Sequence, residues 1–213
     1  MADNLKQKAI SGARWGFIEN LSYMSVTFIV AFVLQRWFLT SHEFGLIGHL
    51  AIFIAVSISF IDSGFSSAII KKQNPTPEDL KTVFTTNLII SVVCYTLLFI
   101  LAVPIAKFFR HQELVSLLRV LSIVLILNAF SIVQRALLVK ELNFKKLTIC
   151  SFFSSLLSGV IGIYMAFVGY GVWALVGQQI SKQFFNSLLL WILGDWKVSL
   201  GFYISNFKTK KRG

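Results

Sequence analysis

Charged side chains are scarce in this sequence. Only 14% of its 213 residues are Asp, Glu, Lys or Arg, whereas 56% are hydrophobic and 21 are Phe. A soluble domain usually carries about 25% charged residues, and this chain has too few polar groups to cover the surface of a water-soluble fold. The scarcity of charge excludes an ordinary soluble domain and indicates a protein whose solvent is lipid.

Cysteines and catalytic motifs are scarce as well. The two cysteines, Cys94 and Cys150, lie in separate apolar runs, so no disulfide framework is indicated. The three histidines, His42, His49 and His111, do not have the spacing of metal ligands. No phosphate-binding Gly loop, nucleophile elbow or close carboxylate pair occurs. We therefore expect no catalytic residues, no metal and no cofactor, and the sequence gives little support to a membrane enzyme of envelope assembly.

Acidic residues are fewer than basic ones, with nine Asp and Glu against 20 Lys and Arg and a formal net charge of +11. In a soluble protein this excess would raise the question of nucleic acid. Here the basic residues fall mostly in short stretches between apolar runs, without a stacking platform. We expect no nucleic-acid partner and interpret the charge as a signal of membrane topology.

Long apolar runs are what the sequence has in abundance. A helix needs about 20 apolar residues to cross a hydrocarbon core of ~30 Å. Segments of that kind lie at about 15–38, 44–69, 80–103, 117–138, 147–168 and 172–193. The sequence therefore predicts an all-α, polytopic membrane helix bundle of about six transmembrane helices, forming one domain over residues 15–194.

Three local signals mark the ends of these spans. Thr76-Pro77-Glu78-Asp79 has the hydroxyl, proline and acids of a helix start. Pro104 is expected to mark the end of the third span. Gly169-Tyr170-Gly171 is a turn so short that the fifth and sixth helices must be antiparallel neighbours.

The distribution of Lys and Arg predicts the orientation. Residues 1–14 form a basic segment at the membrane interface, and residues 195–213 a basic tail. With the second and fourth connections, these segments hold 15 basic residues, whereas the other side holds four, namely Arg36, Lys107, Arg110 and Arg119. The positive-inside bias places both termini in the cytoplasm. The first apolar run is too long for a signal peptide and has no cleavage site, so it is expected to be an uncleaved span.

Polar residues form one face of the last predicted span. A charge at mid-membrane costs ~2.5–3.5 kcal/mol and needs a partner or water. Gln179, Lys182, Gln183 and Asn186 follow at i, i+3, i+4 and i+7, with Gln178 beside them. Two interpretations stay open: these residues line a water-filled cavity, or they form interhelical hydrogen bonds that seal the bundle.

Two carboxylates lie within other spans. Asp62 is nine residues before Lys71, which places it ~13 Å below the cytoplasmic end of its helix. It is either a proton or cation site or a partner for a basic residue such as Lys182 or Arg14. Glu19 lies about one turn into the first span and either faces a cytoplasmic vestibule or snorkels to the interface.

Weaker polar patterns occur elsewhere. Asn128, Ser131 and Arg135 share a face of the fourth span, and Asn87 and Ser91 share a face of the third. These residues either complete a lumen or pack between helices. The fifth span indicates close helix packing alone, because small residues recur every fourth position in two rows, Ser151, Ser155, Gly159 and Ser154, Ser158, Gly162.

Several stretches resemble the N-terminal half of bacterial oligosaccharide flippases of the polysaccharide biosynthesis protein family, in the multidrug/oligosaccharidyl-lipid/polysaccharide transporter superfamily. The resemblance covers nearly the whole chain. It rests on Leu5-Lys6-Gln7-Lys8-Ala9-Ile10-Ser11-Gly12 with Trp15, Glu43-Phe44-Gly45-Leu46-Ile47-Gly48, Ile61-Asp62-Ser63-Gly64-Phe65, Asn128-Ala129-Phe130 with Gln134-Arg135, Leu142-Asn143-Phe144-Lys145-Lys146, and Gly171-Val172-Trp173-Ala174-Leu175-Val176 with Gln178-Gln179.

This resemblance implies a transporter in the bacterial inner membrane. Its cargo would be undecaprenyl-pyrophosphate-linked oligosaccharide, moved to the periplasmic leaflet for lipopolysaccharide O-antigen, colanic acid or other exopolysaccharide assembly. A polar lumen would accept the glycan, and Arg14, Arg135 and Lys182 would attract the pyrophosphate while the prenyl tail stays among membrane lipids. Rocking of two bundles would move the cargo.

Members of the family are usually about twice as long, so the chain is expected to be a truncated or half-size transporter resembling one lobe. It would then pair with a second half-transporter or with a copy of itself. The alternatives are a drug or cation exporter of the same superfamily, coupled through Asp62 or Glu19, and an inactive remnant or scaffold in envelope assembly.

Overall fold

The protein is seen in a computed structural model that describes residues 2–62, 69–70 and 75–194. Within these residues the chain is helical and contains no strand. The helices are α1 (Ala2–Trp37), α2 (Ser41–Asp62), α4 (Pro77–Phe109), α5 (Glu113–Leu121), α6 (Ile123–Lys140), α7 (Phe144–Phe167) and α8 (Trp173–Leu193).

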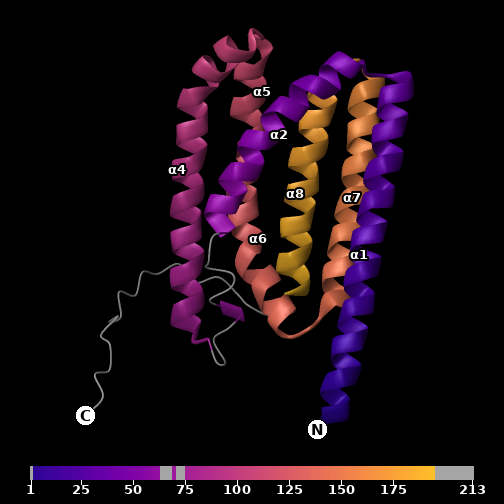
Figure 1. The fold of residues 1–213 in the computed structure, drawn as a ribbon, viewed down its shortest axis with the longest axis vertical. Helices are drawn as coiled ribbons and strands as arrows, with labels where there is room; N and C mark the ends of the chain where they lie inside the picture. Colours follow the sequence, from indigo (N-terminus) through magenta and orange to yellow (C-terminus); the bar gives the residue numbers. More distant parts are fainter. Residues whose placement is uncertain (1, 63–68, 71–74, 195–213) are drawn as a thin grey trace, which may run out of the picture.

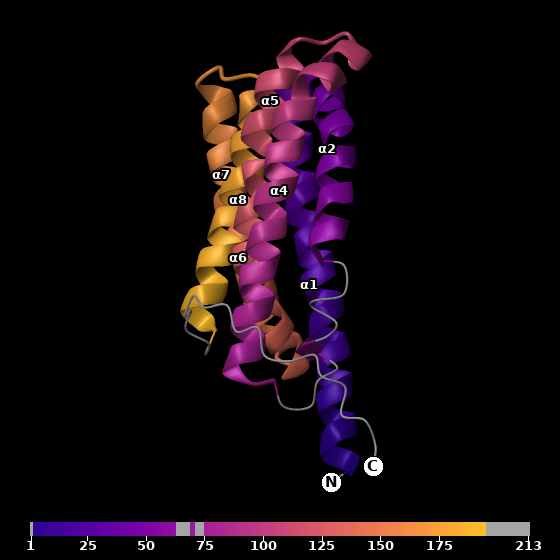
Figure 2. The same ribbon diagram turned by 90° about the vertical axis from the view of Figure 1, so that its left-hand side faces the viewer.

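The long helices run up and down along one axis (Figures 1 and 2). α1 begins at the lower end of Figure 1, and α4 and α1 form the two sides of the bundle. α8 lies between α6 and α7. α1 and α2 come close at the upper end and diverge toward the lower end, so that they form an inverted V, with its apex at the upper end, in front of α7 and α8. We use upper and lower end in the sense of this figure.

An all-α membrane bundle is confirmed. Among the described residues, five segments are long and apolar enough to cross a membrane, and they lie in α1, α2, α4, α5 with α6, and α7. α8 is 21 residues long but more polar, because it carries Gln178, Gln179, Lys182, Gln183 and Asn186. α8 packs against α6 and α7. The predicted sixth span is therefore the helix whose polar side chains most need partners within the bundle.

Several helix ends differ from the predicted ones. α1 begins at Ala2 and passes through the predicted interfacial segment without a break. α2 ends at Asp62, and the rest of the predicted span to residue 69 lies largely outside the described residues, as does the basic tail 195–213. The segment predicted as 117–138 is two helices, α5 and α6, with a turn at Ser122 whose hydroxyl donates to the Leu118 carbonyl at 2.6 Å.

The expectation that Pro104 ends the third span is wrong, because α4 continues to Phe109. Proline removes one backbone donor, but its fixed φ suits a helix, and membrane helices tolerate it. The helix ends at Arg110, which has φ +59° and donates its backbone N–H to the carbonyl of Lys107.

The two other local signals are confirmed. Thr76 caps α4: its Oγ1 accepts from the Asp79 N–H at 3.3 Å, and the Asp79 carboxylate accepts from the Thr76 N–H at 2.8 Å. Gly169 and Gly171 have φ of +93° and +54°, which glycine adopts without strain. The turn they make brings α8 back along α7.

The two rows of small residues on α7 serve two different neighbours. A Cβ on Gly159 would lie 2.7 Å from Val30 of α1, and a Cβ on Gly162 would lie 3.0 Å from the Gln178 side chain of α8. The row ending at Gly159 therefore packs against α1 and the row ending at Gly162 against α8. These contacts hold α8 in a fixed orientation relative to α1.

Candidate functional site

The polar face of α8 contacts a different helix on each side. The Lys182 Nζ lies 3.8 Å from the centroid of the Tyr23 ring on α1. The next residue, Gln183, donates from Nε2 to Asn128 Oδ1 at 3.1 Å and to Ser131 Oγ at 3.3 Å, both on α6. The polar face of α8 is thus directed toward the space bounded by α1 and α6.

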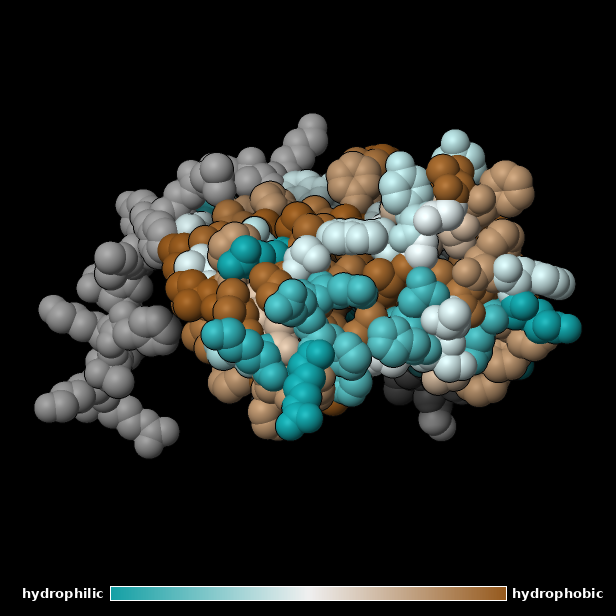
Figure 3. Space-filling model, turned by 90° about the horizontal axis from the view of Figure 1, so that it is seen from above, coloured by the Kyte–Doolittle hydropathy of each residue, from teal (hydrophilic) through white to brown (hydrophobic). Residues whose placement is uncertain are grey.

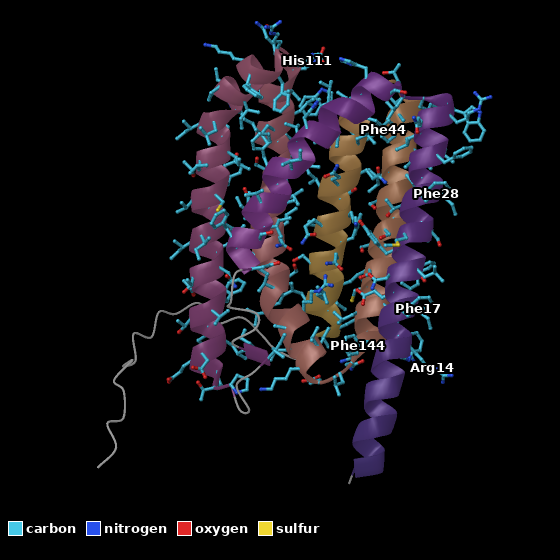
Figure 4. The ribbon with its side chains drawn as sticks, viewed as in Figure 1. Arg14, Phe17, Phe28, Phe44, His111 and Phe144 are labelled. Atoms are coloured by element: carbon cyan, nitrogen blue, oxygen red, sulfur yellow. The ribbon has the colours of Figure 1, made fainter. Side chains whose placement is uncertain are left out.

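A cavity of about 400 Å³, here called the upper cleft, lies within the V of α1 and α2. Its sides include Tyr23 and Thr27 of α1 and Phe44 and Gly48 of α2. Its floor includes the following residues of α7 and α8: Ser155, Ser158, Gln178, Gln179 and Lys182. Figure 4 shows Phe44 near the top of the V.

Lys182 is the one charged residue among those that line the upper cleft. Within the part of the chain that the structure describes, no carboxylate lies within ion-pair distance of its ammonium group, which contacts the Tyr23 side chain through both its ring and its hydroxyl. The Ser155 hydroxyl is buried and has no hydrogen-bond partner among the described residues. The lining of the upper cleft therefore combines one positive charge with a buried hydroxyl that has no partner among the described residues.

A second cavity of about 420 Å³, here called the lower cleft, lies between the end of α2 and α6. Its polar lining consists of Asp62, Asn128, Ser131 and Arg135. Asn128 and Ser131 also accept the Gln183 side chain, so α8 joins the two clefts through the neighbouring residues Lys182 and Gln183.

Glu19 and Arg135 connect α1 to α6 at the lower cleft. The Arg135 Nη2 lies 3.8 Å from the Glu19 Oε1, and the same oxygen accepts from the Ser151 hydroxyl of α7 at 3.0 Å. Glu19 is 14% exposed, whereas Arg135 is 57% exposed. The carboxylate is held by two helices, while the guanidinium stays accessible and shares its cleft with Asp62.

The remaining predicted residues lie apart from this arrangement. Arg14 is exposed and points away from the bundle (Figure 4). Asn87 is fully buried, and its amide has no hydrogen-bond partner among the described residues. Asn186 is partly buried, one helical turn beyond Lys182 toward the lower end. Asp62 shares its cleft with Arg135 and not with Lys182 or Arg14, the two partners considered from the sequence.

The sequence analysis missed three features of the upper cleft: Tyr23, Thr27 and Gly48. The first two follow Glu19 at i+4 and i+8, so the spacing that revealed the polar face of α8 would have revealed a second one on α1. Gly48 carries no such signal. It lines the cleft, and a Cβ there would meet no atom within 4 Å.

The outer surfaces contrast with the clefts. On the other side of α6 and α8, Leu127, Phe130, Phe184, Leu188 and Trp191 line an apolar groove. α1 exposes Phe17 and Phe28 (Figure 4). Hydrophilic side chains gather instead on the upper end of the bundle (Figure 3), where Arg36, Lys107 and Arg110 are exposed. Apolar sides and polar ends are the pattern of a membrane-spanning protein.

Comparison with known proteins identifies the relatives of this chain. Residues 33–210 match the family described as Polysaccharide biosynthesis protein. The succinoglycan biosynthesis transport protein ExoT of Rhizobium meliloti is 30% identical over 186 residues, which is 87% of this chain and 36% of the relative. The teichuronic acid biosynthesis protein TuaB of Bacillus subtilis is 29% identical over 88% of this chain and 39% of the relative.

The lipopolysaccharide biosynthesis protein WzxC of Escherichia coli is 28% identical over 68% of this chain and 29% of the relative. The chain thus spans less than two fifths of the length of these curated relatives. No solved structure matches it. The family match covers most of the chain and agrees with its apolar helices and bacterial relatives. This multi-pass membrane protein belongs to the polysaccharide biosynthesis protein family.

Proposed function

We propose that this chain forms the N-terminal part of a transporter that moves undecaprenyl-pyrophosphate-linked oligosaccharide across the bacterial inner membrane. The cargo would feed the assembly of lipopolysaccharide or exopolysaccharide. The names of the relatives, which include a succinoglycan biosynthesis transport protein, support this assignment. No bond is made or broken in the proposed process, so the chain acts as a pathway and not as an enzyme.

The observation that carries the proposal is the pair of polar clefts within an apolar bundle. Ligand sites are commonly concave, with apolar walls and a few convergent polar groups. The two clefts have this character, and α8 joins them along the axis of the bundle. A path of this kind is what a polar glycan needs if its prenyl tail remains in lipid.

In this proposal Arg135 receives the pyrophosphate. Its guanidinium is 57% exposed, and its distance of 3.8 Å from the Glu19 carboxylate is longer than that of a charge-assisted hydrogen bond, about 2.7–2.9 Å. An arriving phosphate can therefore compete for the guanidinium. Glu19 keeps its hydrogen bond from Ser151, so the carboxylate would not lose its only partner. Arg14 has no part in this step, since it points away from the bundle.

The proposed orientation places the lower end in the cytoplasm. The chain begins at the lower end, where Arg135, Lys140, Lys145 and Lys146 also lie near the ends of α6 and α7. Arg135 would then meet the pyrophosphate on the side where lipid-linked sugars are made. A second half-transporter or another copy of the chain would cover the open side of the clefts and supply the partner for rocking motions.

A drug or cation exporter of the same superfamily fits the clefts less well. The upper cleft presents the Lys182 ammonium to its contents, and both carboxylates of the lower region lie near Arg135. The Lys182 ammonium would repel a cationic cargo. To reach the carboxylates, the cargo would have to displace Arg135. Uptake of fluorescent cationic drugs into inverted vesicles would favour the exporter, whereas the proposed function predicts none.

The test is replacement of Arg135 in the native host. Arg135→Gln is expected to lower surface polysaccharide about tenfold or more, the effect of losing a hydrogen bond between charged groups. Lipid-linked oligosaccharide should accumulate in the cytoplasmic leaflet. The control is Arg36→Gln, which removes an exposed arginine at the upper end and should leave surface polysaccharide normal. Normal surface polysaccharide in Arg135→Gln, at equal protein level, would contradict the proposal.

A further inference from the structure

We infer that the upper cleft binds a carboxylate-bearing sugar unit, so that the protein selects acidic oligosaccharides. This inference rests on the proposed function and assigns a second, separate contact to the same cargo. Arg135 in the lower cleft binds the pyrophosphate, and Lys182 in the upper cleft binds the carboxylate of the glycan.

The charge of the upper cleft supports this assignment. Lys182 is the one charged residue in the lining, and its ammonium rests on the face of the Tyr23 ring at 3.8 Å. A cation over an aromatic ring gains ~0.5–2 kcal/mol, less than a charge buried in a membrane bundle costs. The ammonium keeps donor capacity that the ring does not use. A single anionic group entering the cleft would accept hydrogen bonds from the Lys182 ammonium and neutralise its charge.

The neutral polar groups match the hydroxyls of a sugar. Gln178 and Gln179 each present an amide that donates and accepts hydrogen bonds, and Thr27 contributes a hydroxyl. The Ser155 hydroxyl is buried and has no partner among the residues that the structure describes, which is a cost unless a ligand or water satisfies it. Such groups suit the paired donors and acceptors of a hydroxylated ring.

The remaining walls are apolar and include the Phe44 ring. Val26, Ala31, Ile47, Ala51 and Leu175 line the cleft between the polar groups. Their surfaces suit the C–H faces of a sugar ring. The volume of about 400 Å³ lies within the range of small-molecule sites, roughly 300–1,000 Å³.

The single positive charge of the upper cleft favours a carboxylate over a pyrophosphate. The fork of donors on arginine matches carboxylate and phosphate oxygens alike, and lysine is a single point charge, so the number of charges distinguishes the two anions. No arginine lines the upper cleft, and Arg135 lines the lower one. One carboxylate needs one positive charge, and the upper cleft supplies one.

Gly48 gives a way to fill the cleft without changing Lys182. A Cβ on Gly48 would meet nothing within 4 Å, so a larger side chain there enters open space in the cleft wall. Gly45 lies one turn earlier on α2, is equally open, and does not line the cleft. Leucine favours a helix over glycine, so neither substitution weakens α2.

The test is ligand binding to the full chain in lipid nanodiscs, measured by isothermal titration calorimetry. The probes are trigalacturonate, which is acidic, maltotriose, which is neutral, and inorganic pyrophosphate. Trigalacturonate should bind on the order of tenfold more tightly than maltotriose, the effect of one hydrogen bond between charged groups. Lys182→Gln should abolish that preference, and Gly48→Leu should weaken trigalacturonate binding by a similar factor.

The controls are Gly45→Leu and Lys107→Gln, which lie outside the cleft and should bind as the unchanged chain does. Equal binding of the acidic and neutral probes, or a preference that survives Lys182→Gln, would overturn the inference. Pyrophosphate binding that depends on Lys182 and not on Arg135 would also overturn it. Normal surface polysaccharide in Arg135→Gln would refute the proposed function alone, because the calorimetry reports on the upper cleft without transport.

Discussion

α7 and α8 are neighbours that both carry many polar residues, yet the two sets differ in reach. The serines of α7 are short: Ser154 and Ser158 donate to carbonyls of their own helix at 3.1 and 3.0 Å, and Ser151 reaches Glu19 where α1 packs directly against α7. The amides and the lysine of α8 are long and reach other helices or a cleft. Polar residues of the first kind let helices approach closely, and those of the second kind place polar groups in the interior of the bundle.

The largest expected effect comes from enlarging a small residue on α7. Gly159→Leu would place atoms against Val30, because even a Cβ there lies 2.7 Å from the Val30 side chain. We expect a loss of about 3 kcal/mol in the free energy of unfolding, at the upper end of what overpacking costs. Circular dichroism during SDS titration of the purified chain measures it.

Gly16→Leu is the matched control for this prediction. Gly16 lies on α1, and a Cβ there meets nothing within 4 Å. Its replacement should leave stability unchanged or raise it by up to about 1 kcal/mol through helix propensity. Equal stability of Gly159→Leu and Gly16→Leu would show that α7 does not depend on close packing against α1.

A smaller effect is expected from the part of α8 that seals the bundle. Gln183→Leu removes the two hydrogen bonds to Asn128 and Ser131. The expected cost is about 1 to 2 kcal/mol, because interhelical hydrogen bonds in membranes are worth ~0.6–1.7 kcal/mol each. The same titration measures it, and Phe184→Leu, which changes the apolar groove, is the neighbouring control. If Gln183→Leu lowered the free energy of unfolding as much as Gly159→Leu, α8 would depend on its polar contacts as strongly as α7 depends on close packing, which would contradict the contrast between the two helices.

Local chemistry made part of the fold predictable. The polar face of α8, the rows of small residues on α7, the cap at Thr76 and the turn at Gly169 each depend on residues a few positions apart. For α8, Gln183 makes the interhelical hydrogen bond of one interpretation, while Lys182 lines a cleft whose filling with water stays a prediction.

Pairings between distant helices were not predictable from spacing. The Glu19 contact with Arg135 joins α1 to α6, and the sequence gives no rule for choosing that partner among the basic residues. The upper cleft depends on the divergence of α1 and α2, which is a property of tertiary packing. The prediction that Pro104 ends a helix failed because a proline removes one backbone hydrogen bond without ending a long apolar helix.

The most direct test of the central claim, that the polar face of α8 lines a water-accessible path, is cysteine accessibility along that helix. Cys94 and Cys150 are first replaced by alanine in the full protein, and single cysteines are introduced into α8 in native membranes. A membrane-impermeant thiol reagent should label Gln179→Cys, Lys182→Cys and Asn186→Cys, and should leave Phe184→Cys, Leu188→Cys and Ile192→Cys, whose native residues are exposed on apolar surface, unlabelled. Labelling without this helical period, or protection of position 182, would contradict the account.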